Sequence, residues 1–312
     1  MIKVEDVTIA YGKKQVLNHI HFQIKKGDVV GLLGKNGEGK STTMNILTGY
    51  LSPDEGKVWI SDIDMGKDPK SAKKKIGYLP EKPPVYKDMK VMEYLQFVAE
   101  LKNVKPVDEE VKRVMVLLDL WDRRYDYIKV LSKGWQQRVG FAQCLIGDPE
   151  IFILDEPLVG LDPKESKMIR NLILELSKEH TILISSHILS EIEELCNQIM
   201  ILKDGQMILD DSLQHVKNHK TNHQYKLTVK GDKDAILQLL NHSDLLSDVQ
   251  YIKEEEQGVH RFVVSVGQKQ DIRDNLFGLL VGKKYSVYGI EHFENTLEDV
   301  FMEYSGKEEA GC

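Results

Sequence analysis

The sequence predicts an α/β fold built around a parallel sheet, because three short apolar runs each end in polar residues. The runs have the all-apolar character of strands buried on both faces, and they cover residues 29–33, 151–154 and 181–184. They are followed, in order, by a glycine-rich loop, an Asp-Glu pair and a histidine. Because ligands of open α/β sheets bind beyond the carboxyl ends of the strands, we expect these three groups at one edge.

The glycine-rich loop, GKNGEGKST, covers residues 34–42 and precedes a helical pattern through Met44, Ile46 and Leu47. A strand, this loop and a helix together match the phosphate-binding pattern GxxxxGK[ST]. Glycines let the backbone wrap around a phosphate, and the helix N-terminus adds its positive dipole end. Lys40 would reach the β- and γ-phosphates, and the Ser41 hydroxyl would ligate Mg²⁺. The loop therefore predicts a nucleoside triphosphate site rather than an empty glycine turn.

The bulk properties exclude several classes of protein. The chain has 312 residues, 41% of them hydrophobic and 29% charged, which is typical of one large or two ordinary globular domains. A net charge of −7 gives no indication of a nucleic-acid or anionic-lipid surface. Three cysteines without metal or disulfide spacing fit a reducing cytoplasm. No apolar stretch approaches the roughly 20 residues of a membrane span, so we expect any membrane role to need a partner chain.

Three sequence patterns predict the other elements of the N-terminal part: alternation of apolar and polar residues, the positions of prolines, and apolar residues repeated at helical spacing. Residues 1–28 and 57–60 read as strands outside the parallel sheet, and the strand at 76–79 stops at Pro80-Glu81. Residues 91–120 carry two amphipathic helical stripes. The proline-bounded segment before them contains Val85, Tyr86 and Met89, and two roles stay open for it: packing against the following helix, or docking a partner.

From about residue 213 the pattern changes to a β-α-β-β-α-β order, which predicts a small ferredoxin-like unit. Its strands fall near residues 225–229, 249–253, 260–266 and 285–290, with a turn over 254–258, helices over 233–241 and 270–281, and a closing helix over 296–304. His215, His219 and His223 have helical spacing in the stretch before it, where a polar linker is favoured over a metal site because no acidic or cysteine ligand is near.

Further motifs narrow the family. Residues 131–138, LSKGWQQR, resemble the LSGGQ signature, Gly160-Leu161-Asp162 resembles a D-loop, and His187 the switch histidine. Glu81 stands where a Q-loop glutamine is usual. Over roughly residues 1–212 the chain thus resembles the ATPase subunit of an ABC transporter. Residues 77–81 and 295–301 are similar to segments of ATPases that serve type 2 ABC exporters.

This resemblance implies an organisation and partners. It implies an ABC ATPase domain over 1–212, with an antiparallel β subdomain and a helical subdomain at about 83–147, then a linker over 213–223 and an α+β accessory domain over 224–312. The subunit would dimerise around two ATP molecules, with an identical copy or a paralogue, and drive separate membrane-spanning permease subunits. It would act at the cytoplasmic face of the membrane through those permeases, without binding nucleic acid.

Site roles combine the resemblance with the chemistry of each side chain. ATP binding falls to Tyr11, Gly34, Asn36, Gly37, Gly39, Lys40, Ser41 and Thr42, with Tyr11 as a candidate to stack on adenine. Catalysis falls to Glu156 as the base that polarises water, with Lys40, Glu81 and His187. Oxygen ligands for Mg²⁺ are Ser41, Glu81 and Asp155. Ser132, Gly134 and Asp162 would act in trans, on the nucleotide of a partner subunit.

Two departures and two alternatives complete the hypothesis. Lys133 replaces a glycine of the signature and is expected to point outward; Glu81 accepts hydrogen bonds where a glutamine would also donate. One alternative is a soluble, non-transport ABC ATPase acting on another macromolecular complex, which the negative charge and single cassette disfavour. The other is a P-loop GTPase or kinase, in which the signature would have no role.

Overall fold

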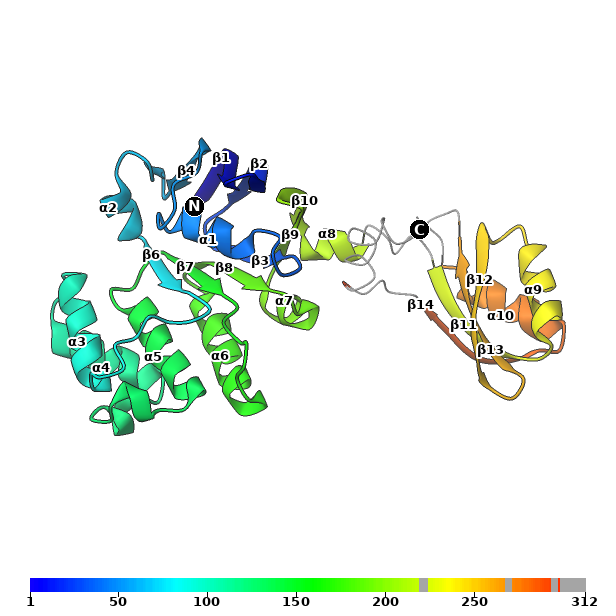
Figure 1. Ribbon diagram of the computed structural model, residues 1–312. Helices are drawn as coiled ribbons and strands as arrows, with labels where there is room; N and C mark the ends of the chain where they lie inside the picture. Colours follow the sequence, from blue (N-terminus) through cyan, green and yellow to red (C-terminus); the bar gives the residue numbers. More distant parts are fainter. Residues whose placement is uncertain (219–223, 267–270, 293–296, 298–312) are drawn as a thin grey trace. The chain divides into compact units, whose positions relative to one another are not determined.

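The computed structural model describes residues 1–218, 224–266, 271–292 and 297, and divides the chain into two compact units, Met1–Leu213 and Gln214–Cys312 (Figure 1). The boundary falls next to the residue where the sequence pattern changes. A short helix, α8 (Leu213–Asn218), begins the stretch expected to be a linker, with Leu213 and Val216 buried. Residues 219–223 of that stretch, with His219 and His223, lie outside the described residues.

The first unit contains a six-stranded sheet in the order β10-β9-β3-β8-β7-β6. Its strands are β3 (Val29–Leu33), β6 (Ile76–Leu79), β7 (Ile151–Asp155), β8 (Thr181–Ser186), β9 (Gln198–Lys203) and β10 (Gln206–Ser212). All neighbours pair in parallel except β10, which is antiparallel to β9. Every residue of β3, β7 and β8 is buried, which explains why these strands are mainly apolar, with polar residues at the ends of β7 and β8.

An antiparallel sheet in the order β2-β1-β4-β5 lies beside it in the same unit. The strands are β1 (Ile2–Tyr11), β2 (Lys14–Ile24), β4 (Glu55–Ile60) and β5 (Ile63–Asp64). Helix α1 (Lys40–Leu47) packs between the two sheets, because Met44 and Leu47 share one hydrophobic core with Val4 of β1 and Ile153 of β7 (Figure 1). This packing fixes the start of α1, and hence the end of the glycine-rich loop, against the parallel sheet.

Helices cover the opposite face of the parallel sheet (Figure 1). Three of them fall within residues 83–147: α3 (Val91–Leu101), α4 (Val107–Leu117) and α5 (Lys133–Leu145), with short 3₁₀ turns η1 (Trp121–Arg123) and η2 (Ile128–Val130). The remaining helices of the unit are α2 (Pro69–Lys73), α6 (Pro163–Leu176) and α7 (Leu189–Leu195). The two stripes predicted over 91–120 are the buried faces of α3 and α4. The predicted α/β fold, with its antiparallel and helical parts, is therefore confirmed.

The second unit has the element order β11 (Gln224–Lys230), α9 (Lys233–Asn241), β12 (Asp248–Glu256), β13 (Val259–Ser265), α10 (Arg273–Gly282) and β14 (Ser286–His292). Its antiparallel sheet runs β12-β13-β11-β14, and both helices pack on the face that carries Leu227 and Phe262. The ferredoxin-like description of this unit stays an interpretation. The closing helix expected over 296–304 and the segment 295–301 fall almost entirely outside the described residues.

One local prediction in this unit is wrong. The turn expected over 254–258 is shorter, because β12 continues through Glu256 and β13 begins at Val259. The acidic run that suggested a turn lies on an edge strand, where its side chains are exposed and ionic contacts are available. Glu255, for example, lies 2.5 Å from the Arg261 guanidinium and 3.6 Å from the Lys253 ammonium.

Candidate nucleotide site

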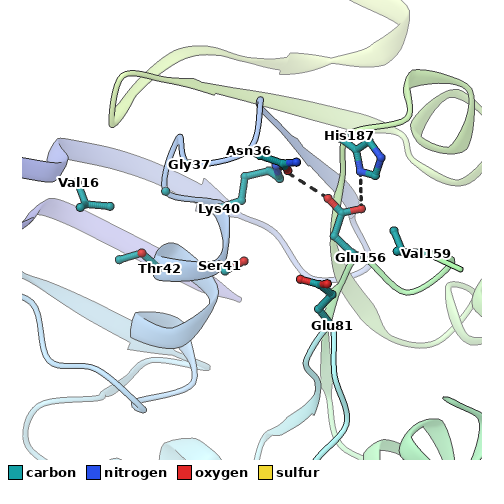
Figure 2. A pocket seen from close by; sticks show the side chains of 11 residues that line it. Val16, Asn36, Gly37, Lys40, Ser41, Thr42, Glu81, Glu156, Val159 and His187 are labelled. Atoms are coloured by element: carbon teal, nitrogen blue, oxygen red, sulfur yellow. Dashed lines mark hydrogen bonds and ion pairs between the residues drawn. The ribbon is translucent and has the colours of Figure 1, made fainter. Parts of the chain in front are cut away.

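The ends of four parallel strands bring the predicted polar groups to one sheet edge. Strand β3 leads into the glycine-rich loop, β7 ends at Asp155, β8 is followed by His187, and β6 is followed by Pro80 and Glu81. Figure 2 shows Lys40, Glu81, Glu156 and His187 around one space. A parallel sheet gathers its strand ends at one edge, so residues more than 100 positions apart in the sequence meet here.

The glycine-rich loop needs its glycines at two positions in particular. Gly37 and Gly39 have φ angles of 91° and 105°, a region that disfavours side chains. A β-carbon on Gly39 would also come within 2.7 Å of the Leu17 side chain. Gly39 is the N-cap of α1, so the turn presents the first amides of that helix toward the space beside Lys40.

Lys40 provides a buried cation at the start of α1. Its Nζ donates hydrogen bonds to the carbonyl oxygens of Gly34 (2.7 Å) and Lys35 (3.3 Å), and it lies 3.9 Å from Glu156 Oε1. Burial lowers the pKa of the Lys40 ammonium, and the nearby carboxylates of Glu156, Asp155 and Glu38 act in the opposite direction. A phosphate arriving here would therefore find a cation that is already held by carbonyl groups along the loop.

Glu156 is held in a constrained position next to that cation. Its φ is +48°, a conformation that costs a non-glycine residue about 1–3 kcal/mol and persists only where the surroundings impose it. Its backbone N–H donates to Ser185 Oγ (2.9 Å), and Ser185 Oγ donates to Asp155 Oδ1 (2.5 Å). His187 Nδ1 lies 2.9 Å from Glu156 Oε2 (Figure 2). The carboxylate is thus placed between a lysine and a histidine, where a base for water is needed.

A cavity of about 450 Å³ opens between these groups, within the range of small-molecule sites. Most of the predicted residues line it: Asn36, Gly37, Gly39, Lys40, Ser41, Thr42, Glu81, Glu156 and His187. Three others do not: Gly34 acts through its carbonyl, Asp155 lies behind Ser185, and Tyr11 sits 52% exposed at the end of β1. Val16 and Val159 complete the lining.

The oxygen-bearing side chains of the cavity fit Mg²⁺ only together with a nucleotide. Ser41 and Glu81 line the cavity, and Asp155, whose Oδ1 accepts from Ser185, would act through water. Among the described residues, no cluster of three or more His, Cys, Asp or Glu is arranged to hold a metal. A hydroxyl, few carboxylates and substrate phosphates are the usual Mg²⁺ ligands in phosphoryl-transfer sites, so the donor set is appropriate.

The signature and D-loop residues form a separate surface, which is called here the signature surface and comprises Ser132, Lys133, Gly134, Asp162 and Glu165. Ser132 is the N-cap of α5, and its Oγ accepts from the Trp135 N–H at 3.4 Å. Asp162 is the N-cap of α6, and its carboxylate accepts from the Glu165 N–H at 2.8 Å. Lys133 is exposed, as expected, and its ammonium lies beside Gly160. None of these residues lines the cavity of its own chain.

Sequence reasoning missed several contributors to the two regions. Ser185 joins the backbone of Glu156 to the side chain of Asp155, and Val16 reaches the cavity from β2. Glu165 lies against Gly134, where a β-carbon would collide with its carboxylate. Only Glu165 had a sequence signal, since an Asp-x-x-Glu spacing before an apolar stripe is typical of a capping box.

The chain is similar to ATP-binding proteins of ABC transporters. The family model described as "ABC transporter" matches residues 17–159. An ABC transporter ATP-binding protein of Bacillus subtilis, YhcH, is 34% identical over 98% of this chain and 96% of its own length. The bacitracin transport ATP-binding protein BcrA of Bacillus licheniformis is 32% identical over 98% of this chain and 97% of its own.

Solved structures of ATP-binding cassettes also resemble the chain. The ATP-binding cassette MJ0796, solved as a dimer in a post-hydrolysis state with ADP and Pi, matches with a TM-score of 0.63 and 26% identity, over 68% of this chain and 99% of that one. In the described parts of the present chain, no helix combines the length and apolar character of a membrane crossing.

Proposed function

The chain belongs to the family of ABC transporter ATP-binding proteins, and from this premise we propose that two ATPase units close around two ATP molecules to drive separate permease subunits. The family supports an ATP-hydrolysing, ATP-driven subunit of a transporter. The dimer, the residues of each site, the metal and the permease contact are the proposed refinements.

The observation that carries the dimer is the separation of the two regions. The cavity is lined by most of the groups predicted for the P-loop side, Lys40 and Glu156 among them, while Ser132, Gly134 and Asp162 lie outside it. Ser132 nevertheless starts a 13-residue helix whose first amides suit an anion. If a second copy supplies the anion, the twofold operation that places one signature surface on the partner's cavity also places the partner's on this one. Two composite sites then arise from one contact.

The residues of this chain divide the work of hydrolysis in that arrangement. The loop amides and Lys40 would hold the β- and γ-phosphates, and Mg²⁺ bound with Ser41 and Asp155 would offset the charge on those phosphates. Glu156, held at a positive φ and beside His187, would accept the proton of the attacking water. His187, with a half-exposed side chain, is free to turn its ring toward the γ-phosphate when Glu156 engages water. Tyr11 stays a candidate for stacking on adenine.

ATP binding would close the dimer, and ATP hydrolysis would open it again. Contacts to the γ-phosphate from the partner's signature surface exist only in the closed dimer, so ATP shifts the population toward closure and its hydrolysis releases it. Permease subunits at the membrane would follow this movement from the cytoplasmic side.

A second cavity of the first unit suggests where a permease helix docks. It measures about 470 Å³ and lies between the end of α1 and the helices α3 and α5, with Tyr50, Pro84 and Lys102 among its lining residues. Tyr50 is 78% exposed, and Tyr86, two residues beyond Pro84, is 57% exposed while packing edge-on against Tyr94 of α3. The segment after Glu81 therefore links the nucleotide cavity to an apolar groove, into which a short amphipathic helix would fit.

The docking proposal is tested by replacing exposed tyrosines with aspartate. Tyr50→Asp and Tyr86→Asp should leave ATP hydrolysis and the melting temperature close to those of the parent, and should reduce co-purification of the permease. Tyr288→Asp, a similarly exposed tyrosine in β14 of the second unit (59% exposed), is the matched control. Unfolding of Tyr86→Asp would show that its packing on α3 is its main role, and undiminished co-purification would place the docking surface elsewhere.

The composite site is tested by mixing two inactive chains. Lys40→Ala removes the phosphate cation, and Ser132→Arg places a large side chain on the signature surface. Gly134→Asp is unsuitable, because its β-carbon would collide with the Glu165 carboxylate and its negative charge would repel that carboxylate inside the same subunit. In a mixed dimer one site carries both lesions and the other carries none, so random mixing leaves about a quarter of the sites intact.

Measurable hydrolysis in the mixture, near a quarter of the parent rate and absent from each variant alone, supports donation in trans. The absence of hydrolysis in mixtures shown to contain mixed dimers would mean that one subunit completes its own site.

A further inference from the structure

Glu165 places a carboxylate at the start of the signature helix. The residue is the third of α6, and its side chain extends to α5: a β-carbon added to Gly134 would collide with both Glu165 carboxylate oxygens and with the carbon between them. Gly134 is the second residue of α5 and is buried. The absence of a side chain at Gly134 is therefore used already in the single subunit, by a carboxylate of the same chain.

A negative charge beside the N-terminus of α5 is favourable for a physical reason. The first amides of an α-helix lack intrahelical acceptors, and the N-terminus carries partial positive charge, so a carboxylate there is stabilised. In the proposed dimer, the same helix start faces the γ-phosphate of the partner's ATP. A carboxylate and a phosphate at one helix start repel each other, since unit charges about 4 Å apart interact appreciably even near a solvated surface.

We propose that Glu165 is a further residue of the composite site, which the partner's γ-phosphate must displace before the dimer closes. This inference rests on the proposed function. It makes Glu165 a determinant of nucleotide specificity, because ADP in the partner's cavity has no γ-phosphate to compete for the helix start. The competition between the Glu165 carboxylate and the γ-phosphate also raises the ATP concentration at which the dimer closes. Closure therefore requires that ATP occupies the partner's cavity.

The way Glu165 is held suits a side chain that moves. Its Oε2 accepts the Asp162 N–H at 3.4 Å, a long hydrogen bond, whereas the Asp162 side chain caps the Glu165 N–H at 2.8 Å independently of the glutamate carboxylate. Helix α6 would therefore keep its principal cap when Glu165 leaves Gly134. The exposed Lys133 ammonium beside Gly160 offers a positive charge near the same surface.

Two substitutions separate this role from a structural one. Glu165→Gln keeps the shape and the capacity to cap the helix but removes the charge; Glu165→Ala removes all three. Both are placed in a Glu156→Gln chain, where slow hydrolysis lets the ATP dimer accumulate. The quantity measured is the ATP concentration at half-maximal dimer, by sedimentation velocity, together with the melting temperature of each chain.

If Glu165 competes with the γ-phosphate, both substitutions lower that concentration, by roughly tenfold. The difference from the parent shrinks at high salt, because the repulsion is screened. With ADP, the Gln variant gains dimer relative to its parent.

An unchanged midpoint in the Gln variant, with a parent that dimerises, would overturn the role of Glu165 and leave the composite site standing. So would weaker dimerisation of the Ala variant alone, which is the result of a capping role. A parent that stays monomeric at saturating ATP would overturn the composite site itself.

Discussion

The nucleotide cavity and the signature surface both place a carboxylate of this chain where phosphate charge is expected, but they hold it differently. Glu156 lies 3.9 Å from the Lys40 ammonium, in a strained backbone conformation and fixed by Ser185 and His187. The Glu165 carboxylate lies against Gly134, and the hydrogen bond that holds it is a long one, accepted from the Asp162 N–H at 3.4 Å. In the proposed function the first carboxylate stays in place to act as the base, and the second is displaced when the dimer closes. The cavity would then be preorganised, and the signature surface would change on closure.

The largest effect on turnover is expected when the same substitution, glutamate to glutamine, is made at Glu156 and at Glu165 and the two variants are compared. Glu156→Gln should lower the turnover number by roughly 10²–10⁴ while ATP affinity persists, because an amide cannot accept the proton of the attacking water. Glu165→Gln in an otherwise unchanged chain should keep turnover within a few-fold of the parent. Steady-state hydrolysis and nucleotide binding measure both. Equal losses in the two variants would remove the contrast, and parental hydrolysis in Glu156→Gln would show that another group is the base.

An intermediate effect, on the Mg²⁺ requirement of hydrolysis, is expected when Ser41 near the start of α1 is compared with Ser132 at the start of α5. Ser41→Ala should raise the Mg²⁺ concentration needed for half-maximal hydrolysis by roughly 10–100-fold, since a metal ligand is lost. Ser132→Ala should lose an N-cap, about 1 kcal/mol of stability, and one contact to the partner's nucleotide, with an unchanged Mg²⁺ requirement.

Magnesium titrations of the ATPase rate, after chelation by EDTA, distinguish the two serines. If Ser132→Ala raises the Mg²⁺ concentration for half-maximal hydrolysis as much as Ser41→Ala does, then metal binding is not specific to the nucleotide cavity. If Ser41→Ala has the Mg²⁺ requirement of the parent, its hydroxyl is not a ligand.

The smallest effect is expected at Glu81, which lies in the cavity but after a different strand from Glu156. Glu81→Gln restores a side chain that both accepts and donates hydrogen bonds, and should change turnover by less than about tenfold. Its Mg²⁺ dependence should shift in the weaker direction, because a carboxylate binds the ion more strongly than an amide. A loss as large as that of Glu156→Gln would instead make Glu81 the base.

The cavity could be predicted from the sequence to a larger extent than the signature surface. Its residues follow apolar strands directly, so local pattern and the rule for parallel sheets are enough to place Glu156, His187 and the loop. The contact of Glu165 with Gly134 joins residues 31 positions apart, and its existence depends on how closely the first turns of α5 and α6 approach each other. Periodicity cannot provide that information, because it fixes the buried face of a helix and not what lies beside its first turn.

Two further differences between the sequence-based expectations and the structure also arise from tertiary contacts that a single sequence does not reveal. Ser185 directly follows the apolar run 181–184 in the sequence, but its role in joining Asp155 to Glu156 depends on the register of β7 against β8. Residues 254–258 were expected to form a turn, yet Glu254–Glu256 belong to an edge strand, which leaves such side chains in solvent. In both cases the neighbour across the sheet decided the outcome, and a single sequence does not show which strand that neighbour is.

The most direct test of the central claim identifies the chain whose signature surface meets the γ-phosphate. A mixed dimer is formed from an isotopically heavy Glu156→Gln chain and a light chain that carries Lys40→Ala and Glu156→Gln, so that ATP is held mainly by the heavy P-loop. An ATP analogue with a photoreactive group on the γ-phosphate is bound, crosslinked and located by mass spectrometry. If the signature surface acts in trans, the label is found on residues 132–138 of the light chain. Label on that segment of the heavy chain would show that each subunit completes its own site, and would contradict the composite site.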